Sequence, residues 1–178
     1  KRWFGDSVVT DNGKPMSDGG KPLVVYHGTV ADVTEFSEQN IKRPYNGYGY
    51  HFATKPSVAN HYADHKYLSN GNVMPVYLNI KNPFTGDFFE FKKENNFGLF
   101  EDYEATEALK QLGYDGIRYD DTKGMPKGKG GVNYVAFDPT QIKSAIGNNG
   151  NFDPSNPDIR YARGTNEPMT NKDVVGNQ

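Results

Sequence analysis

Short apolar segments alternate with polar, turn-rich segments along most of this chain. The runs at residues 23–26, 48–53 and 73–80 are rich in β-branched or aromatic residues over strand-like lengths, which predicts three short strands. Pro75 lies inside the third run and predicts an edge position or a bulge, because proline has no N–H for a sheet ladder. The segments NYVAFD and QIKSAI predict two more strands further along the chain.

Two other segments have helical periodicity. We expect Thr54 to cap the first helix, with Pro56 in its first turn. The apolar face of this helix follows the i, i+3, i+4 spacing and comprises Val58, Ala59, Tyr62 and Ala63. Residues 103–112 (YEATEALKQL) form the clearest amphipathic pattern, which Gly113 ends, and YDGIRYDD then predicts a short strand. The segment GDFFEFKKENNFGLF has no decisive period.

Composition narrows the fold class. The 178 residues include 20 Gly, 11 Pro, 12 Tyr and 11 Phe, which is typical of short strands joined by tight turns rather than of a helical bundle. This length fits one domain, and the sequence becomes polar and turn-rich from Gly147 onward. We therefore predict an α+β domain over residues 1–162 and a polar, flexible tail over residues 163–178. Because residue 1 is Lys, we also expect the chain to be part of a larger polypeptide.

Charge and hydropathy exclude several classes of protein. Lys and Arg total 20 against 22 acidic residues, so no overall field favours nucleic acid or membrane, although local patches remain open. The chain has no Cys, which excludes disulfide frameworks, thiolate metal sites and a catalytic thiol. No segment approaches the roughly 18 apolar residues of a membrane span, and the first residues lack the apolar stretch of a signal peptide. We expect a soluble domain that is compatible with the cytoplasm, and the sequence leaves its compartment open.

The tetrapeptide YHGT places candidate chemistry at the end of the first strand. His27 supplies an imidazole, Gly28 permits close approach to the backbone, and Thr29 supplies a hydroxyl. These three residues fit a strand end that faces a ligand. A histidine with satisfied hydrogen bonds before an ordinary turn is the alternative.

The stretch GYGYHFATKPSVANHYA, residues 47–63, crowds four aromatic rings and two histidines around two glycines. One interpretation is a strand that enters a helix with its apolar side in the core. The other is a flat slot for a planar ligand, to which Tyr50, His51, Phe52 and Tyr62 would contribute.

Three further patterns raise other chemistries. His51, His61 and His65 suggest a metal cluster, but no acidic residue of the HExxH type lies between the last two, so we predict no metal site. Asp115, Asp120 and Asp121 suggest paired carboxylates, but the adjacent residues Asp120 and Asp121 point to opposite faces of a strand. The Lys- and Gly-rich segment at residues 121–132 lacks the spacing of a phosphate-binding P-loop and is interpreted as a mobile loop that faces substrate.

Taken in order, YHGT, GYGYHFATKPSVANHYA and NYVAFDPTQIKSA give this chain a pattern that resembles the ADP-ribosyltransferase family. The likeness is to the branch with histidine in the first motif, which includes diphtheria toxin and the poly(ADP-ribose) polymerases. The run from RWFGDS through GYDGIRYD to QIKSAIGNNGNFDPSNPDIRYA is similar to the ADP-ribosyltransferase domains of polyvalent phage and mobile-element proteins, often attached to MuF-like polypeptides. The resemblance covers roughly residues 2–162 and implies two bent antiparallel β-sheets around an NAD cleft, with few helices.

The resemblance also implies roles for individual residues. His27 would hold a hydroxyl of the adenosine-side ribose of NAD, and the Gly28 backbone would pair with the nicotinamide amide. Tyr62 would stack on the nicotinamide ring, with Phe52 supporting the strand end. NAD is then the substrate, and ADP-ribose passes to a macromolecular acceptor, protein as the first expectation and nucleic acid as the second.

The chain departs from the family pattern at two positions. His51 stands where relatives carry tyrosine, with Tyr50 one residue earlier, and Asn133 stands where they carry glutamate. Asparagine can hydrogen-bond a ribose hydroxyl but has no charge to stabilise a cationic sugar. The pattern therefore favours transfer of single ADP-ribose units with His27, Tyr62 and Asn133 as the central residues. An NAD-binding module without turnover and an NAD glycohydrolase are the alternatives.

Overall fold

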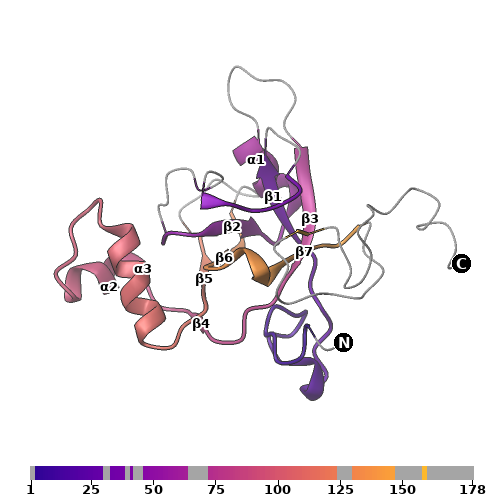
Figure 1. The fold of residues 1–178 in the computed structure, drawn as a ribbon, viewed down its shortest axis with the longest axis horizontal. Coiled ribbons are helices and arrows are strands. Elements are labelled where there is room, and N and C mark those ends of the chain that lie inside the picture. Colours follow the sequence, from indigo (N-terminus) through magenta and orange to yellow (C-terminus); the bar gives the residue numbers. More distant parts are fainter. Residues whose placement is uncertain are drawn as a thin grey trace, which may run out of the picture.

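The computed structural model describes residues 3–29, 33–38, 41, 46–63, 72–123, 130–146 and 158–159, without the side chains of residues 61–63. Its strands form one seven-stranded sheet in the order β4-β5-β6-β2-β1-β3-β7 (Figure 1). They are β1 Val25–Thr29, β2 Tyr50–Ala53, β3 Asn72–Leu78, β4 Pro83–Phe84, β5 Gly116–Asp120, β6 Val132–Ala136 and β7 Ile142–Ser144. The mixed α+β prediction is confirmed, and the strand segments expected from the sequence all occur.

The sheet consists of two groups of hydrogen-bonded strands, which we call ladders, and a short β1/β2 pairing joins them. β4, β5, β6 and β2 form one ladder, in which only the β4/β5 pairing is parallel. β1, β3 and β7 form the other, with antiparallel pairing throughout. Within the described strands β1 and β2, the register joining the ladders contains the single pair Tyr26↔Ala53. The resemblance implied two antiparallel sheets, but the described strands form one sheet, because the pair Tyr26↔Ala53 joins the two ladders and the β4/β5 pairing is parallel.

Period-two alternation assigns the strand side chains to opposite faces of the sheet. Tyr134 and Ala136 of β6 belong to the larger core cluster, which also contains Phe36 and Phe52. Val135, between them, packs in a second cluster beneath the helices. Asn133 shares the face of Val135, because it lies two residues away on the same strand.

In the described part of the chain, three α-helices flank the sheet: α1 Pro56–Ala63, α2 Phe88–Glu94 and α3 Asp102–Gln111, with short 3-10 turns at Met16–Asp18 and Pro139–Gln141. Figure 1 shows α2 and α3 together beside β4 and β5, and α1 beside β1 and β3. α3 follows the predicted segment closely, and Gly113 ends it with φ of 90°. Among the described helices, none combines the length and apolar character needed to cross a membrane.

Two local predictions were wrong. Thr54 is not at the N-cap of α1, because the helix begins at Pro56 and its first N–H groups donate to the carbonyl of Lys55. The hydroxyl of Thr54 instead donates to the carbonyl of Val132 at 2.9 Å and so ties β2 to β6. Pro75 is not on an edge strand, since β3 lies between β1 and β7. The β3/β7 register begins one residue later, at Val76↔Ser144, so the missing N–H of Pro75 interrupts no pair of that ladder.

Candidate active site

The candidate site lies where β1 and β2 separate, which we call the crease. An unbroken antiparallel register from Tyr26↔Ala53 would next pair Gly28 with His51. In the structure Gly28 pairs with Val73 of β3 and has no β2 partner in the register. The crease is therefore a local interruption of the backbone pairing beside Gly28.

Alternation of the ladder shows which way the Gly28 backbone points. The carbonyl of Pro75 accepts from the N–H of Ala145 at 3.0 Å, so the polar backbone atoms of Pro75 point away from β1. Its partner Tyr26 must then direct its N–H and C=O toward β2, and so must Gly28, two residues later. One donor and one acceptor of Gly28 therefore face the crease.

His27 occupies the acceptor that Gly28 would have used. Its Nδ1 lies 2.9 Å from the carbonyl oxygen of His51. Because a carbonyl only accepts, Nδ1 carries the proton and Nε2 has a free lone pair. The ring packs edge-on to Phe36 with centroids 5.0 Å apart and lies 5.5 Å from Phe52. Burial lowers the pKa of His27, and the bond to His51 offsets only part of this effect, so the ring is neutral.

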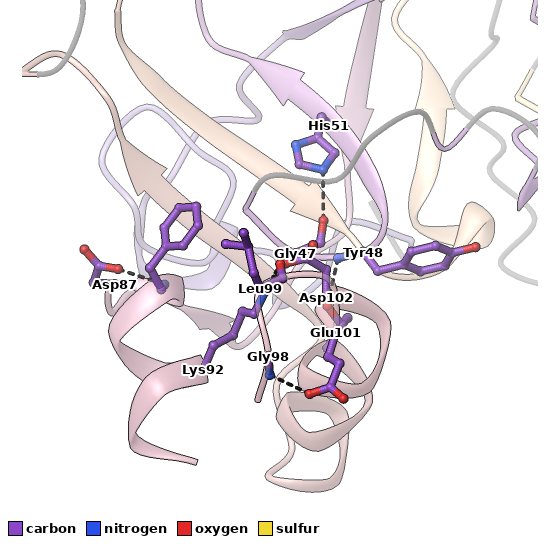
Figure 2. Close-up of polar contacts among 11 residues, drawn as sticks. Gly47, Tyr48, His51, Asp87, Lys92, Gly98, Leu99, Glu101 and Asp102 are labelled. Carbon is purple, nitrogen blue, oxygen red and sulfur yellow. Dashed lines mark hydrogen bonds and ion pairs between the residues drawn. The ribbon is translucent and has the colours of Figure 1, made fainter. Parts of the chain in front are cut away.

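The ring of His51 is held by the backbone of Gly47 (Figure 2). Its Nε2 donates to the carbonyl of Gly47 at 3.1 Å, which leaves the lone pair on Nδ1. Burial lowers the pKa of His51 to about 4, although the hydrogen bond to Gly47 acts in the other direction. Both imidazoles at the crease are thus neutral, and each has one nitrogen fixed by a backbone carbonyl.

Asn133 lies across the ladder from Ala53 and is 3% exposed. Its Nδ2 donates to the carbonyl of Gly131 at 2.9 Å. That bond fixes the amide orientation, because the carbonyl of Gly131 cannot accept from an oxygen. Oδ1 is thereby the side of the Asn133 amide that remains for a ligand hydroxyl.

The other predicted site residues are Tyr50, Phe52, Thr29 and Tyr62. Tyr50 and Phe52 are 4% and 2% exposed and pack with Phe36 on the face of β2 opposite His51. Phe52 packs against the ring of His27, and Tyr50 packs against Phe36, which also contacts that ring. Thr29 ends β1 opposite Asn72. Tyr62 lies in α1, but its side chain is outside the described part.

The acidic candidates Asp120 and Asp121 lie at the end of β5 and directly after it. Asp120 is fully exposed, and hydrogen bonds from Thr122 lower its pKa. Asp121 accepts from the N–H of Gly131 at 2.6 Å and so joins two residues that flank the segment 124–129. Residues 124–129 lie outside the described part of the chain. Among the described residues, no group of three His, Asp or Glu side chains is arranged to hold a metal ion, and His65 is not described.

An open hollow of about 410 Å³ lies elsewhere, at the end of α2. It is lined by Phe89, Lys92, Lys93, Asn96, Phe97, Gly98 and Leu99. The ammonium of Lys92 already bonds Asp102 and the carbonyl of Leu99, each at 2.8 Å. This hollow offers no arrangement for acid, base or nucleophilic chemistry, so the crease is the stronger candidate.

The sequence model of the family described as ADP-ribosyltransferase in polyvalent proteins matches residues 17–152. The chain belongs to this family. The matched range contains the whole crease, and membership in this ADP-ribosyltransferase family supports a general ADP-ribosylation activity. Searches among curated proteins and among solved structures found no match.

Sequence reasoning missed two residues that shape the site of this ADP-ribosyltransferase domain. The carbonyl of Gly47 accepts a hydrogen bond from the His51 ring, and Thr106 of α3 accepts from the N–H of Tyr48 at 2.8 Å. Gly47 has φ of 103°, so the glycine in NGYGY was an available signal. Thr106 offered none, because it reads as one more polar residue of an amphipathic helix.

Proposed function

We propose that this chain is an NAD-dependent mono-ADP-ribosyltransferase, which transfers ADP-ribose from NAD to a macromolecular acceptor and releases nicotinamide. The observation that carries the proposal is the backbone of Gly28 at the crease. It offers one N–H and one C=O, and a primary carboxamide such as that of nicotinamide needs one acceptor and one donor. Since Gly28 has no Cβ, a flat ring can approach this backbone closely.

The two imidazoles fit complementary parts of NAD. Nε2 of His27 is an acceptor for a hydroxyl of the adenosine-side ribose, since Nδ1 is committed to His51. His51 and Tyr62 would border the nicotinamide slot, where aromatic faces attract a planar cationic ring. Phe36 and Phe52 stabilise this arrangement by packing against the ring of His27.

The proposed reaction breaks the glycosidic bond of nicotinamide. The bonding electron pair leaves with nicotinamide, and the ribose becomes an oxocarbenium-like cation. An acceptor nucleophile then bonds to the same ribose carbon and loses its proton to solvent. Asn133 contributes a hydroxyl acceptor through Oδ1 but no negative charge, so we expect slow transfer of single units.

A second candidate is an NAD-binding module without turnover. It is favoured by the amide of Asn133, which is buried, uncharged and committed through Nδ2 to the carbonyl of Gly131. Such a residue orients a ribose but cannot accept a proton from an acceptor nucleophile. The two candidates share a slot and differ in products.

The deciding experiment uses two preparations of NAD, labelled either in the adenylate or in the nicotinamide ring. Each is incubated with the full chain and a cell lysate, and protein, nucleic acid and small molecules are then separated. Transfer requires adenylate label on a macromolecule together with free labelled nicotinamide. The class of labelled macromolecule identifies the acceptor, for which protein is the first expectation.

Matched variants make the result specific. His27→Ala should abolish the label, whereas Lys93→Ala, an exposed change on α2, should leave it unchanged. Free ADP-ribose without labelled macromolecule would identify a glycohydrolase. Intact NAD with saturable binding would identify the binding module, and no binding at all would contradict both proposals.

A further inference from the structure

One peptide group connects α3 to the His51 ring. This peptide joins Gly47 to Tyr48, and its N–H, which belongs to Tyr48, donates to the hydroxyl oxygen of Thr106 at 2.8 Å. The C=O of the same peptide belongs to Gly47 and accepts from Nε2 of His51 at 3.1 Å. Figure 2 shows His51 directed at Gly47, with Tyr48 following in the chain. Because a peptide group is planar, a bond at one end fixes the direction of the other.

The surroundings leave this peptide little freedom. Gly47 has φ of 103°, and a Cβ built on it would overlap Cδ1 of Ile117 and lie 3.6 Å from Oγ1 of Thr106. The ring of Tyr48 packs edge-on against Tyr103, with centroids 5.1 Å apart. Packing therefore restrains both residues of the peptide, and the hydroxyl of Thr106 accepts from its N–H.

α3 is itself a rigid support. Thr106 is 0% exposed, and one turn earlier Asp102 pairs with the buried ammonium of Lys92 at 2.8 Å. This ion pair joins α3 to α2, and Lys92 also bonds the carbonyl of Leu99 (Figure 2). A hydroxyl mounted on such a support can hold a neighbouring backbone group in one orientation.

We propose that Thr106 is a positioning residue for His51, acting through the Gly47–Tyr48 peptide. With the peptide held as it is, the ring must donate from Nε2, so Nδ1 is an acceptor. A flipped peptide would present N–H to the ring, Nε2 would accept, and Nδ1 would become a donor. Thr106 thus sets the hydrogen-bonding character that His51 brings to the slot, an inference that rests on the proposed function for the role of that slot.

The test combines nitrogen NMR of the His51 ring with NAD titration of the full chain. Thr106→Val removes the acceptor, and Thr106→Ser keeps it and serves as the conservative control. The His51 signals are assigned by their loss in His51→Gln. Wild type and Thr106→Ser should hold only the Nε2–H tautomer, whereas Thr106→Val should show a mixture of tautomers. Affinity for NAD should fall roughly fivefold to tenfold in Thr106→Val and recover in Thr106→Ser, as expected for one hydrogen bond.

The two measurements separate this proposal from the proposed function. A pure Nε2–H tautomer in Thr106→Val overturns the positioning role, whatever the affinity. A mixed tautomer in Thr106→Val, with no binding of NAD by wild type, supports the positioning of the ring and overturns the proposed function. If Thr106→Val does not fold, Thr106→Ala replaces it under the same two criteria.

Discussion

Nδ1 of His27 lies 2.9 Å from the carbonyl oxygen of His51, so a side chain replaces the backbone hydrogen bond that would otherwise join Gly28 to β2. The hydrogen bond from the His27 ring holds β1 close to β2 and also prevents a backbone pair between Gly28 and His51. A backbone pair between Gly28 and His51 would close the crease and consume the donor and acceptor proposed to hold nicotinamide. The imidazole is therefore expected to keep the slot open as well as to contact substrate.

Replacing His27 tests both parts of that role. His27→Phe keeps the packing against Phe36 and Phe52 but has no ring nitrogen, which frees the carbonyl of His51 for the N–H of Gly28. We expect NAD affinity to fall roughly tenfold or more, with one hydrogen bond lost outright. Calorimetry measures the affinity, and amide hydrogen exchange reports whether Gly28 becomes protected. Unchanged affinity together with unchanged exchange would disprove this assignment.

The His51 ring predicts a pH dependence of stability. Its pKa falls from an ordinary 6.5 to about 4 on folding, so between these values the unfolded chain binds more protons than the folded one. Stability should therefore rise with pH through this window, and His51 should account for about 3 kcal/mol lost when pH falls from above 6.5 to below 4. His27, whose pKa is also lowered, acts in the same direction.

The measurement is urea unfolding at a series of pH values for wild type and His51→Gln. The difference between the two curves isolates His51 from the carboxylates, which titrate in both proteins. A constant difference from pH 4 to 7 would show that the ring does not titrate differently on folding.

Asn133 predicts unequal losses of stability for two changes of its side chain. Asn133→Asp replaces the Nδ2 donor by an oxygen that faces the carbonyl of Gly131, which should cost about 1–3 kcal/mol. Asn133→Ser, shorter but still able to donate, should cost less. Thermal unfolding at neutral pH compares them, and equal stability of wild type and Asn133→Asp would contradict the assigned amide orientation.

The same position predicts a change in turnover. Asn133→Glu supplies the carboxylate that the family pattern carries there, and a charged contact of this kind is worth on the order of 100- to 1,000-fold in rate. We expect faster release of nicotinamide in Asn133→Glu and no gain in Asn133→Gln, which has the same length without the charge. Equal rates in the two variants would mean that catalysis uses another residue. Asn133→Ala should lower turnover more than NAD affinity.

The buried pair of Lys92 and Asp102 predicts a stability effect far from the crease. Lys92→Met leaves the Asp102 carboxylate and the carbonyl of Leu99 without the ammonium, at a cost of about 3 kcal/mol. Lys93→Met breaks an exposed contact to Glu90 and should change stability by less than about 0.5 kcal/mol. Chemical denaturation distinguishes them, and equal losses would show that burial of the first pair contributes nothing.

Local periodicity predicted much of the fold. The apolar face of α3 repeats at helical spacing, and Gly113 marks its end, so neither depends on distant contacts. α2 was not predicted, because its phenylalanines do not follow one face, although Asp87 caps it by accepting from the N–H groups of Phe89 and Glu90. The cap of α1 was predicted wrongly, since the helix begins at Pro56, one residue too late for Thr54, whose hydroxyl bonds Val132, 78 residues away in the chain.

The residues of the candidate site could be predicted from the sequence, but the contacts that hold them could not. His27, His51 and Asn133 could be found because the family motifs name positions along the sequence. What holds them could not be found, because each ring nitrogen or amide meets a backbone group brought in by the fold. Thr106 is 58 residues from Tyr48, and no local pattern encodes such a distance.

The crease also has a consequence for how this chain folds. β1, β3 and β7 belong to one ladder and β2, β4, β5 and β6 to the other, so the polypeptide passes from one ladder to the other four times. Neither ladder is a continuous piece of sequence, because strands of the other ladder lie between its own strands along the chain. Loops must close over long separations before the pairing stabilises them, which favours slow folding. We expect one cooperative step in which the substrate slot and the rest of the sheet form together, with no autonomous half to cut out.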